Sequence, residues 1–499
     1  MNPWACLAAC LLFAAGASAR PYYVSTSGDD SNAGTFESPF KSISKAVGLV
    51  APGDTIYLRG DTFAVSTTIN LSRSGASGNM CYLLAYPGER AHLECSTMAL
   101  GLRGINLTGS YWYIRGVDIA RAGDNGMVIT GSNNIVEFCS FCGNRDTGLQ
   151  LYNGASNNRI INCDSFDNAD PTSENADGFA PKLSVGSGNS FYGCRSWQNC
   201  DDGWDGYLRG ADGVATTLEH CWSFCNGYLS NGSPSLPDGD GNGFKMGGSD
   251  NKDLAHTMVL RNCLAFDNRV KGYDQNNNKG SMTLLNCTAY RNGTNYSINQ
   301  PLDSGQTVTV MNCVALGAYG SLAASAEQAT NSWMNPFSVS TVDFISIDTN
   351  GARGPRKPDG SLPDIPFMRL APGSDLIDAG TNVGIAYNGA APDLGAYETE
   401  EPSAVRESAS VAAGFLLFQN FPNPFNPKTV VSSWLRAASE VRLVVYDVLG
   451  RQVAVLVNER RAAGSYQDSF DATGLASGVY IYRLTAGSFV ESRTMVILR

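Results

Sequence analysis

Five charged residues stand at matching places in a repeated motif, and together they could do chemistry. Asp177 precedes Gly-Phe, Asp201 and Asp202 precede a Gly-Trp-Asp that supplies Asp205, and Lys245 follows Asn-Gly-Phe. If the Gly-aromatic pairs share one register, the four aspartates crowd two adjacent turns of the chain, with the lysine one turn away. Carboxylates this close raise each other's pKa, and a divalent cation relieves the repulsion. Oxygen ligands without His or Cys favour calcium.

A fourth copy of the motif, Lys271-Gly-Tyr-Asp274, extends the pattern. The glycines of successive copies are 25, 40 and 29 residues apart, and the longest interval contains the Gly- and Pro-rich stretch 227–240, which we expect to leave the body of the protein as a loop. In this register Asp205, Lys245 and Asp274 form one row. A solvated acidic turn is the alternative interpretation, but it gives no reason for a lysine in the row.

Composition narrows the possible functions. Only 16% of the 499 residues are charged, and the formal net charge of −11 argues against nucleic acid or an anionic membrane as the partner. None of the three histidines (His92, His220 and His256) lies in the motifs, so zinc chemistry and a histidine base are not favoured.

A second repeat predicts the fold that must position these residues. Six cysteines are each followed five residues later by asparagine: Cys139, Cys163, Cys194, Cys221, Cys263 and Cys287; Cys313 continues the series without it. Spacings of 24 to 42 residues are typical of solenoids. Short β-branched or aromatic runs fill the units. The repeat predicts an all-β protein, a right-handed parallel β-helix in which each unit is one coil.

Stacked coils place equivalent residues in ladders about 4.8 Å apart. We expect the cysteines to form an inward ladder of free thiols, with Cys139–Cys142 and Cys221–Cys225 as possible disulfide exceptions. We expect the asparagines to take the left-handed conformation at a bend and to bond to one another through their amides. An amphipathic stretch, 40–50, predicts a helix that caps the first coil.

The chain divides into four parts. Residues 1–19 resemble a signal peptide because a short apolar run ends in Ala-Ser-Ala. A β-helix over 20–397 is followed by a polar linker over 398–412. Residues 413–499 carry a net charge of +3, which leaves −14 for the rest, and their alternating runs predict a small Ig-like β-sandwich.

The sequence resembles two known families. The β-helix resembles polysaccharide lyase family 9, the β-helical pectate lyases, through Asp-Gly-Phe-Ala-Pro-Lys at 177–182, the Gly-to-Asp run at 193–205, Asn-Gly-Phe-Lys at 242–245 and the run at 268–276. The last residues resemble type IX secretion sorting domains through Pro-Asn-Pro-Phe-Asn-Pro at 422–427, the hairpin at 446–453 and the strand at 477–484. An accessory carbohydrate-binding module is the alternative for this domain.

The first resemblance implies a lyase that cleaves α-1,4-polygalacturonate by β-elimination, and the signal peptide with the second resemblance implies that it is secreted or attached to the outer cell surface. In that family four aspartates hold a catalytic Ca²⁺ and a lysine is the base. By motif these map to Asp177, Asp201, Asp202, Asp205 and Lys245. We expect a bound cation and burial to lower the pKa of the lysine.

Other charged residues in the matched segments are candidates for binding the substrate: Lys182, Arg195, Arg269, Lys271 and Asp274. Lys182 is also the rival base. The second resemblance implies the outer-membrane secretion machinery as a partner, and we expect a monomer.

Three alternatives stay open. A related lyase could act on another acidic polysaccharide. A metal-free polygalacturonase-type hydrolase would use Asp201 and Asp202 as acid and base, but it would leave Lys245 unexplained. A β-helical polysaccharide-binding surface protein has no need for the Asp/Lys register.

Overall fold

The computed structural model divides the chain into two compact units, Met1–Glu401 and Pro402–Arg499. It describes residues 19–235, 239–399, 415–417, 420, 425–435, 438–448, 450–462, 464–487 and 489–497. The boundary falls inside the predicted linker. The predicted signal peptide and nearly all of the linker lie outside the described residues. Within the part described, no helix is both long and apolar enough to cross a membrane.

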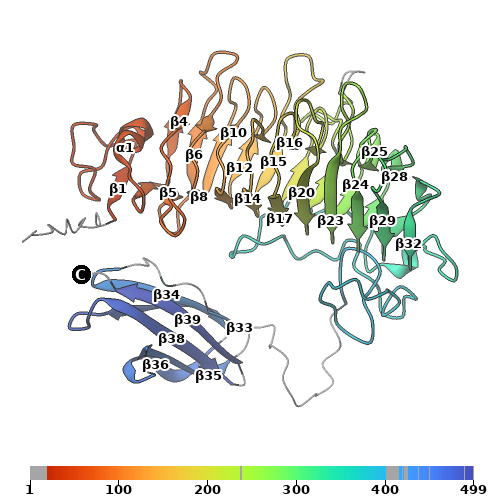
Figure 1. Ribbon diagram of the computed structural model, residues 1–499. Helices are drawn as coiled ribbons and strands as arrows, with labels where there is room; N and C mark the ends of the chain where they lie inside the picture. Colours follow the sequence, from red (N-terminus) through yellow and green to blue (C-terminus); the bar gives the residue numbers. More distant parts are fainter. Residues whose placement is uncertain are drawn as a thin grey trace, which may run out of the picture. The chain divides into compact units, whose positions relative to one another are not determined.

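The first unit is the predicted right-handed parallel β-helix, built from three sheets (Figure 1). Sheet 1 comprises β1 (Pro21–Val24), β2 (Thr55–Leu58), β5 (Cys81–Ala85), β8 (Trp112–Arg115), β11 (Ile135–Glu137), β14 (Arg159–Ile161), β17 (Asn189–Tyr192), β20 (Val214–Glu219), β23 (His256–Arg261), β26 (Met282–Leu285), β29 (Val308–Met311) and β32 (Glu327–Ala329). Sheet 2 comprises β3 (Thr62–Ala64), β6 (Ala91–Glu94), β9 (Val117–Ala120), β12 (Ser140–Cys142), β15 (Asp164–Phe166), β18 (Arg195–Trp197), β21 (Trp222–Phe224), β24 (Leu264–Phe266), β27 (Thr288–Tyr290) and β30 (Val314–Leu316). Sheet 3 comprises β4 (Ile69–Leu71), β7 (Ile105–Leu107), β10 (Met127–Ile129), β13 (Leu149–Leu151), β16 (Phe179–Pro181), β19 (Trp204–Asp205), β22 (Phe244–Lys245), β25 (Lys271–Asp274), β28 (Thr294–Ile298) and β31 (Gly320–Leu322).

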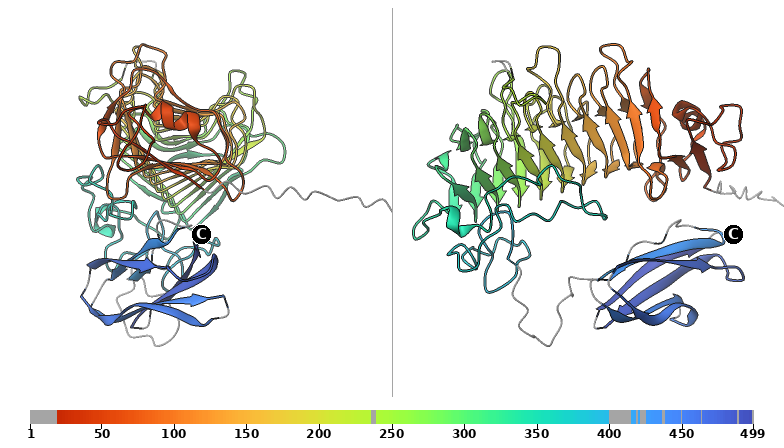
Figure 2. Two further views of the ribbon diagram at one scale, coloured as in Figure 1. Left: turned by 90° about the vertical axis from the view of Figure 1, so that its left-hand side faces the viewer. Right: turned by 180° about the vertical axis from the view of Figure 1, so that it is seen from behind.

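Helix α1 (Ile43–Leu49) confirms the predicted cap. Ser42 accepts a hydrogen bond from Lys45 N and so begins the helix. Ile43, Ala46 and Val47 are buried against the first coils. The end-on view shows α1 lying across the end of the stack, where it covers the apolar interior (Figure 2).

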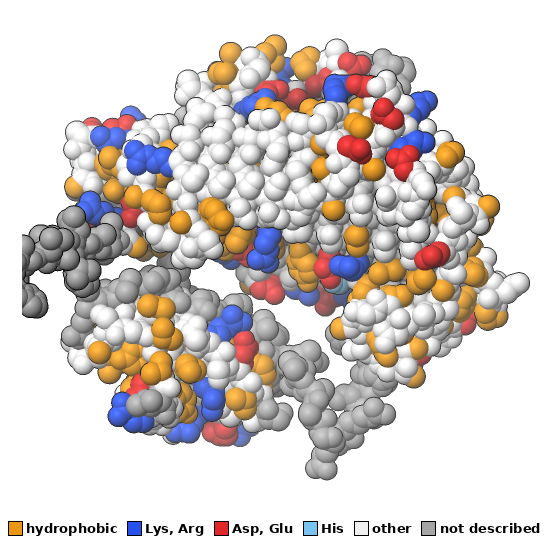
Figure 3. Space-filling model, in the orientation of Figure 1, with side chains coloured by type: hydrophobic (Ala, Val, Ile, Leu, Met, Phe, Trp, Pro, Cys, Tyr) orange, Lys and Arg blue, Asp and Glu red, His pale blue; other side chains and the backbone are white. Residues whose placement is uncertain are grey.

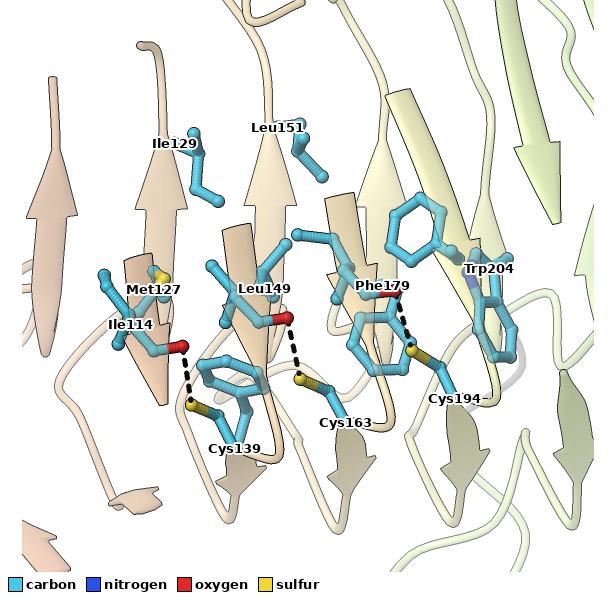
Figure 4. Packing of buried hydrophobic residues seen from close by; sticks show 14 of the residues in the cluster. Ile114, Met127, Ile129, Cys139, Leu149, Leu151, Cys163, Phe179, Cys194 and Trp204 are labelled. Carbon is cyan, nitrogen blue, oxygen red and sulfur yellow. Dashed lines mark hydrogen bonds between the residues drawn. The ribbon is translucent and has the colours of Figure 1, made fainter. Parts of the chain in front are cut away.

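The cysteine ladder is confirmed in full. All seven ladder cysteines are free and at most 2% exposed, and both members of each pair considered for a disulfide are free. Figure 4 shows three of them in line, with each thiol directed at a backbone carbonyl of the preceding coil; Cys163 Sγ donates to Val136 O at 3.5 Å. Burial raises the pKa of Cys139 and Cys163 well above the usual range.

The asparagine ladder is confirmed in its bonding but not in its backbone. Each side-chain amide from Asn144 to Asn268 donates to the Oδ1 of the next asparagine at 2.8–2.9 Å. The expectation of left-handed asparagines at this bend is wrong. The preceding residue takes that conformation instead, for example Gln198 at φ 51° and Asp267 at φ 55°. The asparagine therefore points inward, where its amide can bond along the stack.

A strap formed by residues 332–398 covers the outer face of sheet 2. It contains the short helix η1 (Thr341–Asp343). The face carries stacked rings of Phe166, Trp197, Phe224 and Phe266, with centroids 4.3–5.6 Å apart. Phe367 of the strap packs on Phe266 at 4.7 Å. The strap thus buries a second apolar cluster outside the β-helix.

The second unit is the predicted small β-sandwich of two antiparallel sheets. One comprises β33 (Phe415–Leu417), β34 (Lys428–Leu435) and β37 (Gly464–Asp471); the other comprises β36 (Gln452–Arg461), β35 (Ser439–Asp447), β38 (Gly478–Ala486) and β39 (Phe489–Ile497). Leu443, Tyr482 and Met495 are fully buried between the sheets.

The thiol ladder yields the first prediction. In protein beginning at Arg20, a thiol reagent should modify at most Cys142 and Cys225 under native conditions, because only these two of the twelve cysteines are partly exposed. Unfolding without a reductant should release all twelve. Each disulfide present in the protein would lower the number of released thiols by two and would contradict the ladder of free thiols.

Candidate active site

The four motif strands β16, β19, β22 and β25 are neighbours in sheet 3. Phe179 pairs with Trp204, Trp204 with Phe244, and Phe244 with Tyr273. Their rings point inward and stack with centroids 4.9–5.2 Å apart. Because side chains alternate along a strand, the residues after the aromatics point outward. Asp205, Lys245 and Asp274 therefore form the row that the sequence predicted.

The motif glycines are required by close approach. A Cβ on Gly178 would lie 2.0 Å from Ser196 Oγ and 2.9 Å from Asn199 Nδ2. Gly203 meets Ser223 and Asn226 in the same way. The asparagine ladder of the neighbouring corner thus packs directly against the strands that carry the site, and it fixes their position.

Three of the four predicted ligands face one another. Oxygen atoms of Asp177, Asp201 and Asp202 all lie within 4.8 Å of each other, and these side chains are buried. Asp177 Oδ1 accepts a hydrogen bond from Asp202 N at 3.2 Å. Asp202 Oδ2 is buried, and the ammonium group of Lys245 lies 3.1 Å from it. Burial and neighbouring carboxylates raise the pKa of Asp201 and Asp202 well above the usual range, and burial raises that of Asp177 to about 6.

This triad fits a divalent cation. It offers oxygen atoms only, its side chains are buried, and its repulsion is relieved by positive charge. Asp205 lies apart from it, between two ammonium groups. Lys182 Nζ is 3.2 Å from Asp205 Oδ2, and Lys245 Nζ is 3.8 Å from Asp205 Oδ1. Although burial opposes the shift, the two lysines lower the pKa of Asp205.

Both lysines of the motif are buried in this negative surrounding. Lys182 Nζ lies 2.6 Å from Asp177 Oδ2. Lys245 Nζ lies 3.1 Å from Asp202 Oδ2 and 2.6 Å from Asp240 Oδ2. The lowered pKa expected for Lys245 beside a bound cation stays a prediction. Burial alone would lower the pKa of Lys245, but the surrounding carboxylates outweigh burial and raise it well above the usual range.

Sequence reasoning missed two residues that complete the site. Asp240 N donates to Asp201 Oδ1 at 2.5 Å, and the carboxylate of Asp240 binds Lys245. Asn242 N donates to Asp202 Oδ1 at 2.8 Å. The register of the motif, which puts Asn242 beside Asp202, could have revealed the second. Asp240 lies in the predicted loop outside the register, so no repeat marks it.

The predicted substrate-binding residues separate into two groups. Lys182, Lys271 and Asp274 lie at the site, where Lys271 Nζ is 3.0 Å from Asp274 Oδ1; Arg269 lies at the bend two residues earlier.

Arg195 is not brought to this group. It belongs to β18 in sheet 2, and its side chain is 3% exposed. Its guanidinium binds Asp164 and donates to Ala352 O and Gly354 O at 2.8 Å. It therefore fixes the strap instead of facing the site.

The charged side chains of the β-helix gather along its edges, while a broad face between them is largely uncharged (Figure 3). Fold and site together define a β-helical protein with a buried acidic site at sheet 3, whose oxygen atoms suit a metal ion. Comparisons with known proteins agree. Residues 22–316 match the family described as "Pel9A-like, right handed beta helix region", and residues 419–498 match "Secretion system C-terminal sorting domain".

Individual relatives cover most of the chain. Pectate lyase L of Dickeya dadantii (strain 3937) is 40% identical over 393 residues, which span 76% of this chain and 90% of that protein. A crystal structure of pectate lyase Pel9A superposes with a TM-score of 0.72 and 39% identity, covering 77% of this chain and 98% of that one. A rhamnogalacturonan lyase gives 0.60 and 26%, covering 71% and 97%.

The chain belongs to the Pel9A-like family of right-handed β-helix proteins and is a polysaccharide lyase. Its C-terminal unit is a sorting domain, which directs the protein through type IX secretion to the cell surface or the extracellular space.

The triad yields the second prediction. Calcium added to chelated protein should raise the thermal unfolding midpoint, by the equivalent of about 2.7 kcal/mol when calcium is 100 times its Kd. Asp202→Asn should abolish this rise without destabilising the chelated protein, because it removes a buried charge. The exposed Asp303→Asn is the matched control. A rise that persists in Asp202→Asn would exclude the triad.

Proposed function

We propose that this protein is a calcium-dependent pectate lyase that cleaves α-1,4-polygalacturonate by β-elimination. The observation that carries the proposal is the buried triad of Asp177, Asp201 and Asp202 with Lys245 Nζ 3.1 Å from Asp202 Oδ2. A base beside a cation-type site is what removal of the C5 proton of a uronate requires. The names of the pectate lyase relatives support the same substrate.

In the proposed reaction Lys245 Nζ takes the C5 proton, the electron pair forms the C4–C5 double bond, and the bond from C4 to O4 breaks. O4 leaves with the electron pair of that bond and takes a proton from water. Calcium on the triad would offset the charge that holds the proton on Lys245 and the charge that develops on the uronate. Asp205, held between Lys182 and Lys245, keeps both ammonium groups at the floor of the site.

Asp240 controls access to Lys245. It is the most exposed partner of that lysine, with 51% of its side chain exposed against 8% for Lys245. Its carboxylate occupies the position beside the lysine that faces solvent. We propose that an incoming acidic sugar displaces it. Lys182, Lys271 and Asp274 are proposed to bind the sugar at this site, and the active form is proposed to be the monomer.

A second candidate substrate is favoured by one observation. The rhamnogalacturonan lyase shares the fold over 97% of its length at 26% identity. The backbone of rhamnogalacturonan also contains galacturonate, so the same C5 proton could be removed. Membership of a lyase family sets aside the hydrolase and the non-catalytic alternatives.

The base yields the third prediction. Lys245→Ala should lower kcat on polygalacturonate by about 10²–10⁴-fold, because it removes the proton acceptor. Ultraviolet absorbance of the unsaturated product measures the rate, with calcium and then with a chelator, which should abolish the wild-type activity.

Two further variants sharpen this test. Lys182→Ala should mainly raise KM, and the exposed Lys279→Ala should match the wild type. The assignment of the base fails if Lys245→Ala retains full turnover while calcium still raises its unfolding midpoint. Unsaturated product from rhamnogalacturonan alone would favour the second substrate.

A further inference from the structure

A cavity beside the loop, of which residues 227–235 and 239–241 are described, has no role in the mechanism. Its lining includes Arg269, Arg291, Arg353 and Tyr228. The three arginines come from separate segments: Arg269 from the bend before β25, Arg291 from the bend after β27, and Arg353 from the strap. The chain without its last 87 residues carries a net charge of −14, yet these arginines concentrate positive charge in one cavity.

The arginines are held in place but not neutralised. Arg291 binds Asp267 through two contacts of 2.7 Å and lies over the ring of Tyr290 at 4.7 Å. Within the described ranges, no carboxylate forms an ion pair with Arg269 or Arg353. Arg269 Nη1 instead donates to Ser235 Oγ at 3.3 Å. Arg353 also interacts electrostatically with Asp167, so three guanidinium groups against two aspartates leave the cavity with a net positive charge.

The cavity adjoins the active site through shared segments. Arg269 and Lys271 are two residues apart, and one faces the cavity while the other pairs with Asp274. Both stems of the loop pack on Arg269: a Cβ on Gly227 or Gly241 would lie 2.8 or 3.2 Å from its Cβ. Tyr228 of the loop lines the cavity, whereas Asp240 at its other end binds Lys245.

We propose that this cavity is a second binding site for an anionic saccharide, which holds uronate residues of the polymer beyond those at the aspartate triad. Guanidinium groups bind carboxylates through paired hydrogen bonds, and a tyrosine ring offers an apolar face to a sugar. The loop contacts both sites, because Tyr228 lines the cavity and Asp240 binds Lys245. The identity of the polymer rests on the proposed function; the cationic cavity does not.

The test measures binding without turnover. In the Lys245→Ala background with calcium present, the added pair Arg269→Ala and Arg353→Ala should weaken affinity for polygalacturonate about tenfold, equivalent to about 1.4 kcal/mol. Titration calorimetry gives the affinity, and unfolding midpoints confirm that the variants fold. The matched control is Arg159→Ala, an exposed arginine on sheet 1.

Kinetics with the active base provide the second arm. The pair Arg269→Ala and Arg353→Ala should raise KM for the polymer and leave kcat unchanged, and the rise in KM should become smaller as the oligomer substrate is shortened. The proposal fails if the pair binds the polymer like its parent, if Arg159→Ala weakens binding equally, or if neutral galactan binds as well as polygalacturonate. Tighter binding of dextran sulfate would overturn the uronate assignment. A protein that binds polygalacturonate through these arginines but forms no unsaturated product would contradict the lyase mechanism alone.

Discussion

The fixed register between coils is the constraint on which this structure depends. Each coil repeats its position relative to the last because an asparagine amide bonds to the next and a thiol points into the interior. Asn199 and Ser196 also lie against Gly178, so the ladder that holds the coils together also places the strand beside Asp177. An insertion inside a coil would shift every later residue, and accordingly the described extra residues, 227–235 and 239–241, lie outside the strands of the stack.

The charged residues of the active site destabilise the fold, whereas the ladders stabilise it. Five carboxylates and two ammonium groups lie together at one edge of sheet 3, and three of the carboxylates are buried against one another. Buried like charges are costly unless a partner of opposite charge is present. A rigid β-helix tolerates this because the backbone of each coil is held on both sides by its neighbours. Function is concentrated where the local arrangement is least favourable.

Contacts between the strap and the β-helix give some residues a structural role that the sequence motif does not indicate. Asp164 of β15 binds both Arg195 of β18 and Arg356 of the strap. The two arginines lower the pKa of Asp164 although burial opposes the shift. Arg356 also donates to the carbonyls of Cys163 and Gly193. An arginine inside a matched motif is thereby committed to holding the strap on the β-helix.

The sequence alone determined the coil repeat, and with it the row of Asp205, Lys245 and Asp274, because a β-helix converts spacing along the chain into position on a face. It also determined the C-terminal β-sandwich, whose strands alternate simply between apolar and polar residues, while its sorting role came from the resemblance of its motifs to a known family. Only the tertiary structure decided the rest. Asp240 reaches Lys245 from a loop outside the repeat, Arg195 turns to a strap about 160 residues later in the chain, and Asp205 separates from the triad because lysines from two different coils bind it. Each of these depends on the direction of a side chain or on contacts between segments that share no repeat. The spacing of residues along the sequence carries no information about either.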